Sequence, residues 1–208
     1  MSSSERRYDA VVFDLLTALL DSWSLWNAVA GSAEQGLRWR RRYLELTYQA
    51  GAYSPYEDLV REAARSTGLG TACAEKLVER WNELMPWPEA PQVVSELARR
   101  VPLGVATNCS QRLGLVAAGR CGTAFAAVAT AESVGYYKPR PEPYRAVLNA
   151  LASDPARTLF VAGSAADVPG AKGVGMPVFW HNRMGLKPLD GAAPDYVAGT
   201  LQPLLDLV

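Results

Sequence analysis

Residues 10–21 read AVVFDLLTALLD, an apolar run of four residues that ends on Asp14 and is followed by a second apolar run. Four consecutive apolar residues without polar alternation are typical of a strand buried on both faces, as in a parallel sheet. Asp14 therefore ends the first predicted strand, at the edge where open α/β sheets place ligand-binding residues. A buried carboxylate is costly unless it is paired, so Asp14 is a candidate nucleophile, with a helix cap as its alternative role.

Similar apolar runs follow along the chain, separated by helical patterns. The predicted strands are 10–13, 103–106, 124–130, 158–162 and 178–180, and the predicted helices are 92–100, 111–120, 142–151 and 168–173. This alternation of strands and helices predicts an α/β fold with a doubly wound parallel sheet.

The long connection between the first two strands has a different pattern. It reads as several amphipathic helices with glycine or proline breaks, whereas a crossover between parallel strands needs only about a dozen residues. A proline-rich stretch, 85–91, then stiffens the return. The sequence therefore predicts a helical cap subdomain at 22–85, inserted into a Rossmann-like core domain made of 1–21 and 86–208.

The charge and cysteine content narrow the expected partners and compartment. Lys plus Arg and Asp plus Glu both total 21, so the net charge is zero and favours neither nucleic acid nor an anionic membrane. Three cysteines without CxxC spacing, and an N-terminus that lacks the apolar core of a signal peptide, favour a cytoplasmic setting. The single histidine excludes a His-rich metal site.

Polar residues follow three further strand ends. Thr107 and Asn108 precede a helix, where hydroxyl, amide and backbone N–H groups suit an anion. Lys138, in YYKPRPEPY, can direct its ammonium to Asp14, and Asp167, at the end of FVAGSAAD, can pair with Lys138 or polarise a water. Each also has an ordinary structural alternative: a helix cap, a surface lysine beside a proline turn, and a partner for a helix dipole.

Together, four segments in this order resemble the haloacid dehalogenase (HAD) superfamily over nearly the whole chain. They are VVFDLLTALLD (11–21), LGVATNCS (103–110), YYKPRPEPY (136–144) and FVAGSAADVPGAKGVG (160–175). The helical insertion after the first segment resembles the cap of that superfamily. The resemblance implies a HAD-like Rossmannoid core with an inserted helical cap.

Two positions differ from the magnesium-dependent phosphatases of the superfamily. Those enzymes carry a second aspartate two residues after the nucleophile, where this chain has Leu16. They also carry an acidic metal ligand before the serine of the fourth motif, where this chain has Gly163. Because Mg²⁺ prefers several oxygen ligands, the resemblance implies neither a metal site nor another cofactor.

The metal-independent branch, the L-2-haloacid dehalogenases, is more similar. It implies that Asp14 is the nucleophile, that Lys138 stabilises its charge, and that Asp167 with Ser164 orients the hydrolytic water. The residues that would contact substrate are Thr17, Arg40, Thr107, Asn108 and Tyr144.

Some of these matches are inexact. Arg40 is chosen from WRRRYLE (39–45), a segment that also offers Arg41 and Arg42. The first motif of the branch continues with an aromatic residue, glycine and threonine, where this chain has Leu16, Thr17 and Ala18, so its threonine is lost or moved by one position. In the fourth motif, the serine and asparagine of the branch appear as Ala162 and Ser164.

The implied reaction is hydrolysis of a small 2-substituted carboxylic acid. Asp14 would displace a halide from the α-carbon, and water would open the resulting aspartyl ester. Two alternatives stay open: the same nucleophile acting on a strained ring next to a carboxylate, or a non-catalytic HAD-like binding or assembly partner. The expected partner is a small carboxylate, without nucleic acid or membrane, and a homodimer or a complex with another protein is left open.

Overall fold

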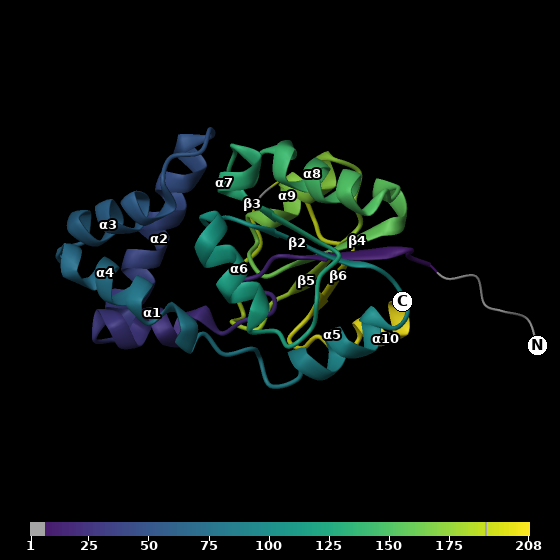
Figure 1. Ribbon diagram of the computed structural model, residues 1–208, viewed down its shortest axis with the longest axis horizontal. Helices are drawn as coiled ribbons and strands as arrows, with labels where there is room; N and C mark the ends of the chain where they lie inside the picture. Colours follow the sequence, from purple (N-terminus) through teal and green to yellow (C-terminus); the bar gives the residue numbers. More distant parts are fainter. Residues whose placement is uncertain (1–6, 190) are drawn as a thin grey trace, which may run out of the picture.

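A six-stranded parallel sheet forms the centre of the described part of the chain, residues 7–189 and 191–208 of a computed structural model (Figure 1). Its strands are β1 (Ala10–Phe13), β2 (Leu103–Thr107), β3 (Ala127–Thr130), β4 (Thr158–Ala162), β5 (Val178–His181) and β6 (Tyr196–Ala198). They lie in the order β3-β2-β1-β4-β5-β6. The order runs outward in both directions from β1, so the predicted doubly wound α/β sheet is confirmed.

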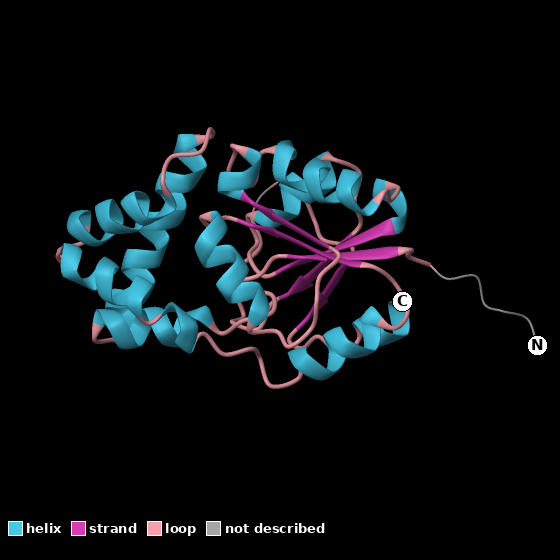
Figure 2. Ribbon diagram, in the orientation of Figure 1, coloured by secondary structure: helices cyan, strands magenta, loops and turns pink. Residues whose placement is uncertain are grey.

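Helices cover both faces of this sheet (Figure 2). Val12 belongs to a buried cluster with residues of α8 (Pro141–Leu151) and α9 (Asp167–Gly173). Val11 and Phe13 point the other way and belong to a cluster with α5 (Ala90–Ala98), α6 (Gln111–Gly119) and α10 (Leu204–Leu207). This alternation explains why the strand is apolar at every position: both of its faces are buried.

The predicted elements agree with the observed ones except at two strands. The bounds of β1 and β4 are confirmed, and the four predicted helices end within about two residues of α5, α6, α8 and α9. The strand predicted to begin at residue 124 begins at Ala127, because β2 starts only at Leu103 and its Gly104 pairs with Ala127. The sequence analysis missed β6, a three-residue edge strand too short for a periodic signal.

Four α-helices and a 3₁₀ helix fill the insertion between β1 and α5. They are α1 (Ser22–Ala30), α2 (Ala33–Ala50), α3 (Tyr56–Ser66), α4 (Thr71–Glu79) and η1 (Trp81–Glu83). Aromatic rings pack in series through this insertion, with Trp26 against Trp39 at 4.5 Å between ring centres and Tyr43 against Tyr56 at 5.4 Å. Among the described residues, no helix is both long and apolar enough to cross a membrane.

The insertion meets the sheet domain at two places. At its base the outgoing and returning chains run side by side, since Asp21 N–H donates to the Met85 carbonyl and Trp87 N–H donates to that of Leu19. Farther along, Tyr53 N–H donates to the carbonyl of Gly135, next to an antiparallel bridge between Ala52 and Tyr136. Helix α2 is thereby held over the carboxyl ends of the strands (Figure 1).

The loop after β1 lies unusually close to the end of β4. A Cβ atom built on Gly163 would lie 2.2 Å from the Ala18 nitrogen and 2.3 Å from Thr17 Oγ1, far inside van der Waals contact. The backbone of the β1 loop cannot move away freely, because Asp14 N–H donates to the Val161 carbonyl at 2.9 Å. Only glycine fits at position 163.

We therefore expect Gly163→Ala to lower the free energy of unfolding by about 1–3 kcal/mol, because the added methyl forces backbone shifts. Gly173→Ala is the matched control, since Gly173 ends a helix and a Cβ there meets nothing within 4 Å. Denaturant unfolding of both variants and the parent measures the difference. Equal stability of the two variants would contradict the packing argument.

Candidate active site

Asp14 lies just after β1, 7% exposed, with both carboxylate oxygens hydrogen-bonded. Lys138 Nζ donates to Oδ1 at 2.8 Å. Oδ2 accepts from the Thr17 hydroxyl at 2.7 Å, from the Thr17 amide at 3.1 Å and from the Ala18 amide at 3.3 Å. Although burial alone would raise the pKa of Asp14, the charge and hydrogen bond of Lys138, with the bonds from Thr17, lower it below its usual value. Asp14 is therefore an ionised carboxylate held in a fixed orientation.

The Thr17 hydroxyl is thus bonded to Asp14, the candidate nucleophile. It was expected among the substrate-binding residues, and it does line the cavity described below. Its hydroxyl proton, however, is donated to Asp14. Its threonine side chain reaches the carboxylate even though it is displaced by one position from the pattern of the similar branch.

Lys138 is buried between two carboxylates. Its Nζ lies 2.8 Å from Asp14 Oδ1 and 3.0 Å from Asp167 Oδ1. Burial opposes the charge on this lysine, but the two carboxylates outweigh it and raise the pKa above its ordinary value. An ammonium that never loses its proton in the working pH range acts as a fixed positive charge between the two aspartates.

Asn108 holds the main chain of Lys138 from both sides. The Lys138 amide donates to Asn108 Oδ1 at 2.7 Å, and Asn108 Nδ2 donates to the Lys138 carbonyl at 3.1 Å. The Tyr43 hydroxyl, from α2, in turn donates to the Asn108 carbonyl at 2.9 Å. Two hydrogen bonds of the Asn108 side chain therefore position Lys138, while its second Nδ2 hydrogen is left for the substrate anion that the sequence predicts at this residue.

Asp167 begins α9, and its carboxylate is buried beside Lys138. Burial raises the pKa of Asp167 to about 6, and Asp14 adds to the rise, against the opposing effect of Lys138. A carboxylate with a pKa near 6 is a better proton acceptor than an ordinary aspartate and is still ionised at neutral pH. Asp167 and Asp14 thus differ in the direction of their pKa shifts, as an acid–base residue and a nucleophile should.

Tyr144 does not line the cavity, contrary to the expectation that it contacts substrate. It is fully buried on α8, and its hydroxyl donates to the main-chain carbonyl of Asp167 at 3.3 Å. Gly170 gives it room, since a Cβ on that residue would lie 2.6 Å from the Tyr144 oxygen. Its contact supports the start of α9, and through it Asp167.

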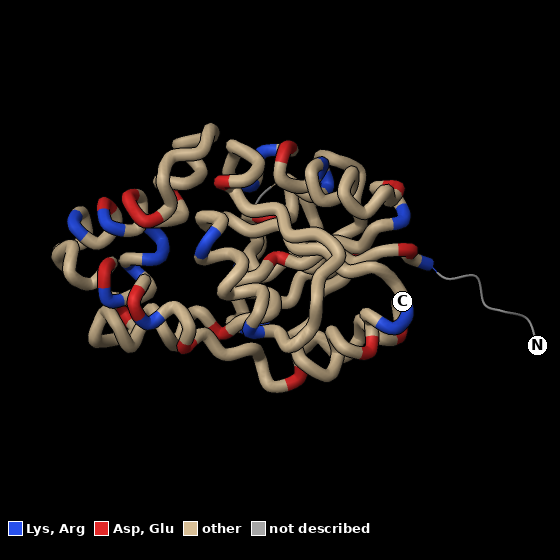
Figure 3. Tube along the Cα trace, in the orientation of Figure 1, with Lys and Arg blue, Asp and Glu red and all other residues tan. Residues whose placement is uncertain are grey.

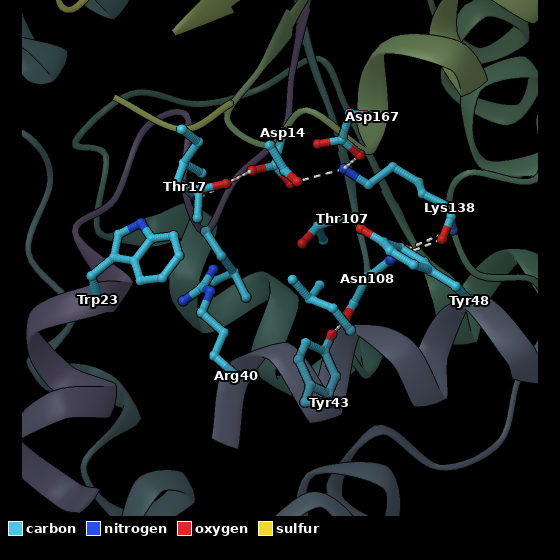
Figure 4. Close-up of a pocket in the computed structure, with 14 residues that line it drawn as sticks. Asp14, Thr17, Trp23, Arg40, Tyr43, Tyr48, Thr107, Asn108, Lys138 and Asp167 are labelled. Carbon is cyan, nitrogen blue, oxygen red and sulfur yellow. Dashed lines mark hydrogen bonds and ion pairs between the residues drawn. The ribbon is translucent and has the colours of Figure 1, made fainter. Parts of the chain in front are cut away.

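A cavity of about 80 Å³ opens between α2 and the carboxyl ends of the strands (Figure 4). The sheet domain supplies most of the polar residues, and the insertion supplies Arg40 and much of the apolar wall. The lining consists of Asp14, Leu16, Thr17, Trp23, Arg40, Tyr43, Leu44, Tyr48, Thr107, Asn108, Lys138, Ser164, Asp167 and Leu186. All but one of the predicted site residues therefore meet at a single cavity, Tyr144 being the exception.

Arg40 faces this cavity from α2, which resolves the choice among the three adjacent arginines. It is only 5% exposed, and its guanidinium lies 4.2 Å from the centre of the Trp23 ring. Its Nη1 donates to Ser22 Oγ at 2.7 Å, while its Nε has no hydrogen-bond partner among the described residues. Arg41 is exposed outside the cavity, and Arg42 pairs with Glu45 at 3.0 Å.

No carboxylate of the described residues lies within ion-pair distance of Arg40. Burial lowers its pKa, but a guanidinium keeps its proton in proteins. A buried cation without an anionic partner is expensive, so the site is suited to an anion supplied from outside. The planar fork of donors matches a carboxylate particularly well.

Leu44, Tyr48 and Leu186 are among the lining residues that the sequence analysis missed. Leu44 and Tyr48 lie four and eight residues after Arg40 on the same helix, so they share its face. Helical spacing from Arg40 was the signal that could have found both. Leu186 follows β5 in an irregular segment, for which the sequence carries no periodic signal.

The donor set does not resemble a metal site. Among residues 7–189 and 191–208, no group of three or more His, Cys, Asp or Glu side chains could hold a metal ion. His181, the single histidine, is buried against the Ala18 carbonyl at 2.8 Å. Leu16 and Gly163 occupy the two positions where the sequence comparison with metal-dependent phosphatases expects carboxylates.

Comparison with known proteins agrees with this geometry. The model of the haloacid dehalogenase-like hydrolases matches residues 8–175. The (S)-2-haloacid dehalogenase of Xanthobacter autotrophicus is 32% identical over 94% of this chain and 82% of its own length. The haloacetate dehalogenase H-2 of Moraxella sp. (strain B) is 25% identical over 98% of this chain and 99% of its own.

Solved structures extend the similarity to three dimensions. The L-2-haloacid dehalogenase from Xanthobacter autotrophicus with chloropropionic acid covalently bound superimposes with a TM-score of 0.84 at 26% identity, covering 96% of this chain and 98% of the other. The similarity thus extends over most of the chain in both sequence and structure. The chain belongs to the haloacid dehalogenase-like hydrolase family.

Proposed function

We propose that this hydrolase removes halide from short 2-haloacids of the (S) configuration through an ester of Asp14. The observation that carries the proposal is the cavity itself: an ionised, immobilised carboxylate faces a buried arginine that lacks an anionic partner. A 2-haloacid has an electrophilic carbon that the Asp14 carboxylate can attack and a carboxylate that the arginine can bind. The (S)-2-haloacid dehalogenases similar to this chain support the same assignment, and favour it over a non-catalytic partner.

In the first step an oxygen of Asp14 attacks the α-carbon from the side opposite the halogen. The new C–O bond forms as the C–halogen bond breaks, and the halide leaves with the electron pair, inverting the carbon. Oδ1 suits the attack, because it accepts one hydrogen bond, whereas Oδ2 accepts three. Arg40 and the Thr107 hydroxyl line the space for the substrate carboxylate and the departing anion.

In the second step water attacks Cγ of Asp14, and Asp167 takes one of its protons. The three donors on Oδ2 stabilise the oxyanion, as an oxyanion hole does. The bond between Cγ and the ester oxygen then breaks, and the product alkoxide takes the remaining water hydrogen from the new carboxyl group of Asp14, while Lys138 stays protonated beside it. Asp167 releases its proton to solvent, so one water is consumed and one halide and one proton are produced.

The size of the cavity limits the substrate. An engineered protein cavity of roughly 150 Å³ accommodates benzene, which has six heavy atoms. The cavity here, at about 80 Å³, is smaller, so it favours the smallest acids of the class. Chloroacetate has five heavy atoms and 2-chloropropionate six, so we expect acids larger than 2-chloropropionate to be excluded.

Three further features belong to the proposal. Residues 22–85 act as a cap that closes on the substrate and excludes bulk water from the ester. The chemistry needs no metal, since Lys138 and Arg40 supply the positive charges. The setting is cytoplasmic, in keeping with the free thiols of Cys73, Cys109 and Cys121.

The ester predicts where oxygen from solvent first enters. In heavy-oxygen water under single-turnover conditions, the label should appear in the peptide that contains Asp14 and not in the 2-hydroxyacid, because hydrolysis occurs at Cγ. Peptide mass spectrometry measures this. Asp14→Asn serves as the matched variant and should release no halide, since an amide is a poor nucleophile of nearly the same shape. Label found directly in the product would refute the ester, and substrate loss without halide would indicate ring opening or another electrophile.

Arg40→Ala should lower kcat/KM by about a hundredfold, with KM raised and kcat lowered, because the guanidinium binds both ground state and departing anion. Arg40→Lys should also be impaired, since an ammonium lacks the planar fork. Arg41→Ala is the control, one residue along the same helix but exposed. Steady-state kinetics equal to the parent in Arg40→Ala would remove this residue from the site.

Activity should be unchanged after exhaustive treatment with EDTA, because no step requires a metal. Halide release before and after chelation, and again after adding Mg²⁺, measures this. Complete loss of activity in EDTA with recovery on Mg²⁺ would overturn the metal-free mechanism while leaving the fold assignment intact.

A further inference from the structure

Tyr48 is the one side chain of the insertion whose polar group reaches the hydrolytic side of the cavity. It lies near the C-terminal end of α2, and the residue is 38% exposed. Its hydroxyl nevertheless points inward, toward the space beneath Asp14 and Lys138 (Figure 4). A tyrosine that is partly exposed and whose hydroxyl faces a cavity lined by polar residues is arranged to present that hydroxyl, not to fill a core.

The surroundings of this hydroxyl come from the sheet domain. Ser164, on the loop after β4, lines the same cavity, and among its charged neighbours the hydroxyl senses the charge of Asp167 most strongly. Burial and Asp167 raise the pKa of Tyr48 further above its already high value, so the phenol stays neutral at any working pH. A neutral phenol can accept hydrogen bonds through its oxygen and donate one of its own.

The Ser164 hydroxyl accepts one hydrogen bond from the main chain. Its Oγ accepts from the Ala166 amide at 3.3 Å, so its hydroxyl proton is free to donate to Tyr48. The Tyr48 oxygen faces the same cavity as Ser164 and Asp167 and lies away from Arg40, which is on the Trp23 side (Figure 4).

We infer that Tyr48 is a further catalytic residue: it holds the hydrolytic water jointly with Asp167, and so acts on the second step but not on the first. This inference rests on the proposed aspartyl ester. The water donates one hydrogen to Asp167 and the other to the Tyr48 oxygen, which turns a lone pair toward Cγ of Asp14. Tyr48 neither gains nor loses a proton; Asp167 takes the proton, and the Cγ–O bond to the product breaks as before.

Because α2 carries Tyr48, the site that holds the hydrolytic water is complete only when the insertion is closed over the sheet. Arg40, eight residues earlier on the same helix, binds in the first step. One helix would thus supply one contact for each step, separated by about two turns.

The test separates the two steps in Tyr48→Phe, which keeps the ring and removes only the hydroxyl. With 2-chloropropionate in rapid-quench experiments, we expect the first turnover of halide at the rate of the parent, within about twofold. Steady-state kcat should fall about tenfold, as expected for one lost hydrogen bond to a reacting group. The variant should therefore show a burst of one halide per site, and intact-protein mass spectrometry should find the ester accumulated on the chain.

Ser164→Ala should give a weaker form of the same burst, and the double variant should be no slower than Tyr48→Phe, because both act through one contact. Tyr196→Phe is the control for loss of a tyrosine hydroxyl, since Tyr196 bonds to Tyr8 on the far edge of the sheet and should show no change. Thermal unfolding of each variant verifies that the fold is kept.

The outcomes distinguish this inference from the proposed function. An ester in the parent with unaltered hydrolysis in Tyr48→Phe would overturn the role of Tyr48 alone. A slower halide burst in Tyr48→Phe would also overturn it, since Tyr48 would then act on the first step. A parent chain that releases no halide and forms no ester would overturn the proposed function, and the role of Tyr48 with it.

Discussion

The buried group of Asp14, Lys138 and Asp167 is the interaction on which the site depends. One ammonium lies within about 3 Å of two carboxylates, and all three side chains are almost completely buried. Removing the lysine would leave two like charges side by side out of water, which is far more costly than losing an exposed ion pair. The fold brings Asp14, Lys138 and Asp167 together where the strand order diverges from β1, so that each buried charge has a partner of opposite sign.

The charges of the cavity also explain its second cation. The two negative charges of Asp14 and Asp167 are balanced by the positive charges of Lys138 and Arg40, so these four side chains have no net charge. Because Lys138 already contacts both carboxylates, Arg40 can bind one further anion. In the proposed first step, negative charge would leave Asp14 for the halide and so move away from Lys138. Arg40, on the Trp23 side, would then stabilise the departing anion. The two cations would thus stabilise the charge before and after its transfer.

Sequence patterns were sufficient to place the polar residues that lie at strand ends. Thr107 ends a buried strand, and Asp14 and Asp167 follow one, and open α/β sheets gather such residues at one edge. The patterns could not settle details decided by register between elements. Whether Arg40 or Arg41 faces the cavity depends on the rotation of α2 over the sheet, and the use of the Asn108 amide by Lys138 depends on a loop that no periodicity describes.

The contact between Thr17 and Gly163 links the chemistry of this site to its backbone. Thr17 can reach Asp14 only because the β1 loop lies against residue 163, where a Cβ atom would overlap both Thr17 and Ala18. An acidic side chain at position 163, as a metal-dependent phosphatase would need, has no room while this contact is made. The three hydrogen bonds to Asp14 Oδ2 therefore exclude a metal-binding carboxylate at position 163, because both would occupy the same space. In this chain the space is given to the hydrogen bonds, and Lys138 and Arg40 supply the positive charge.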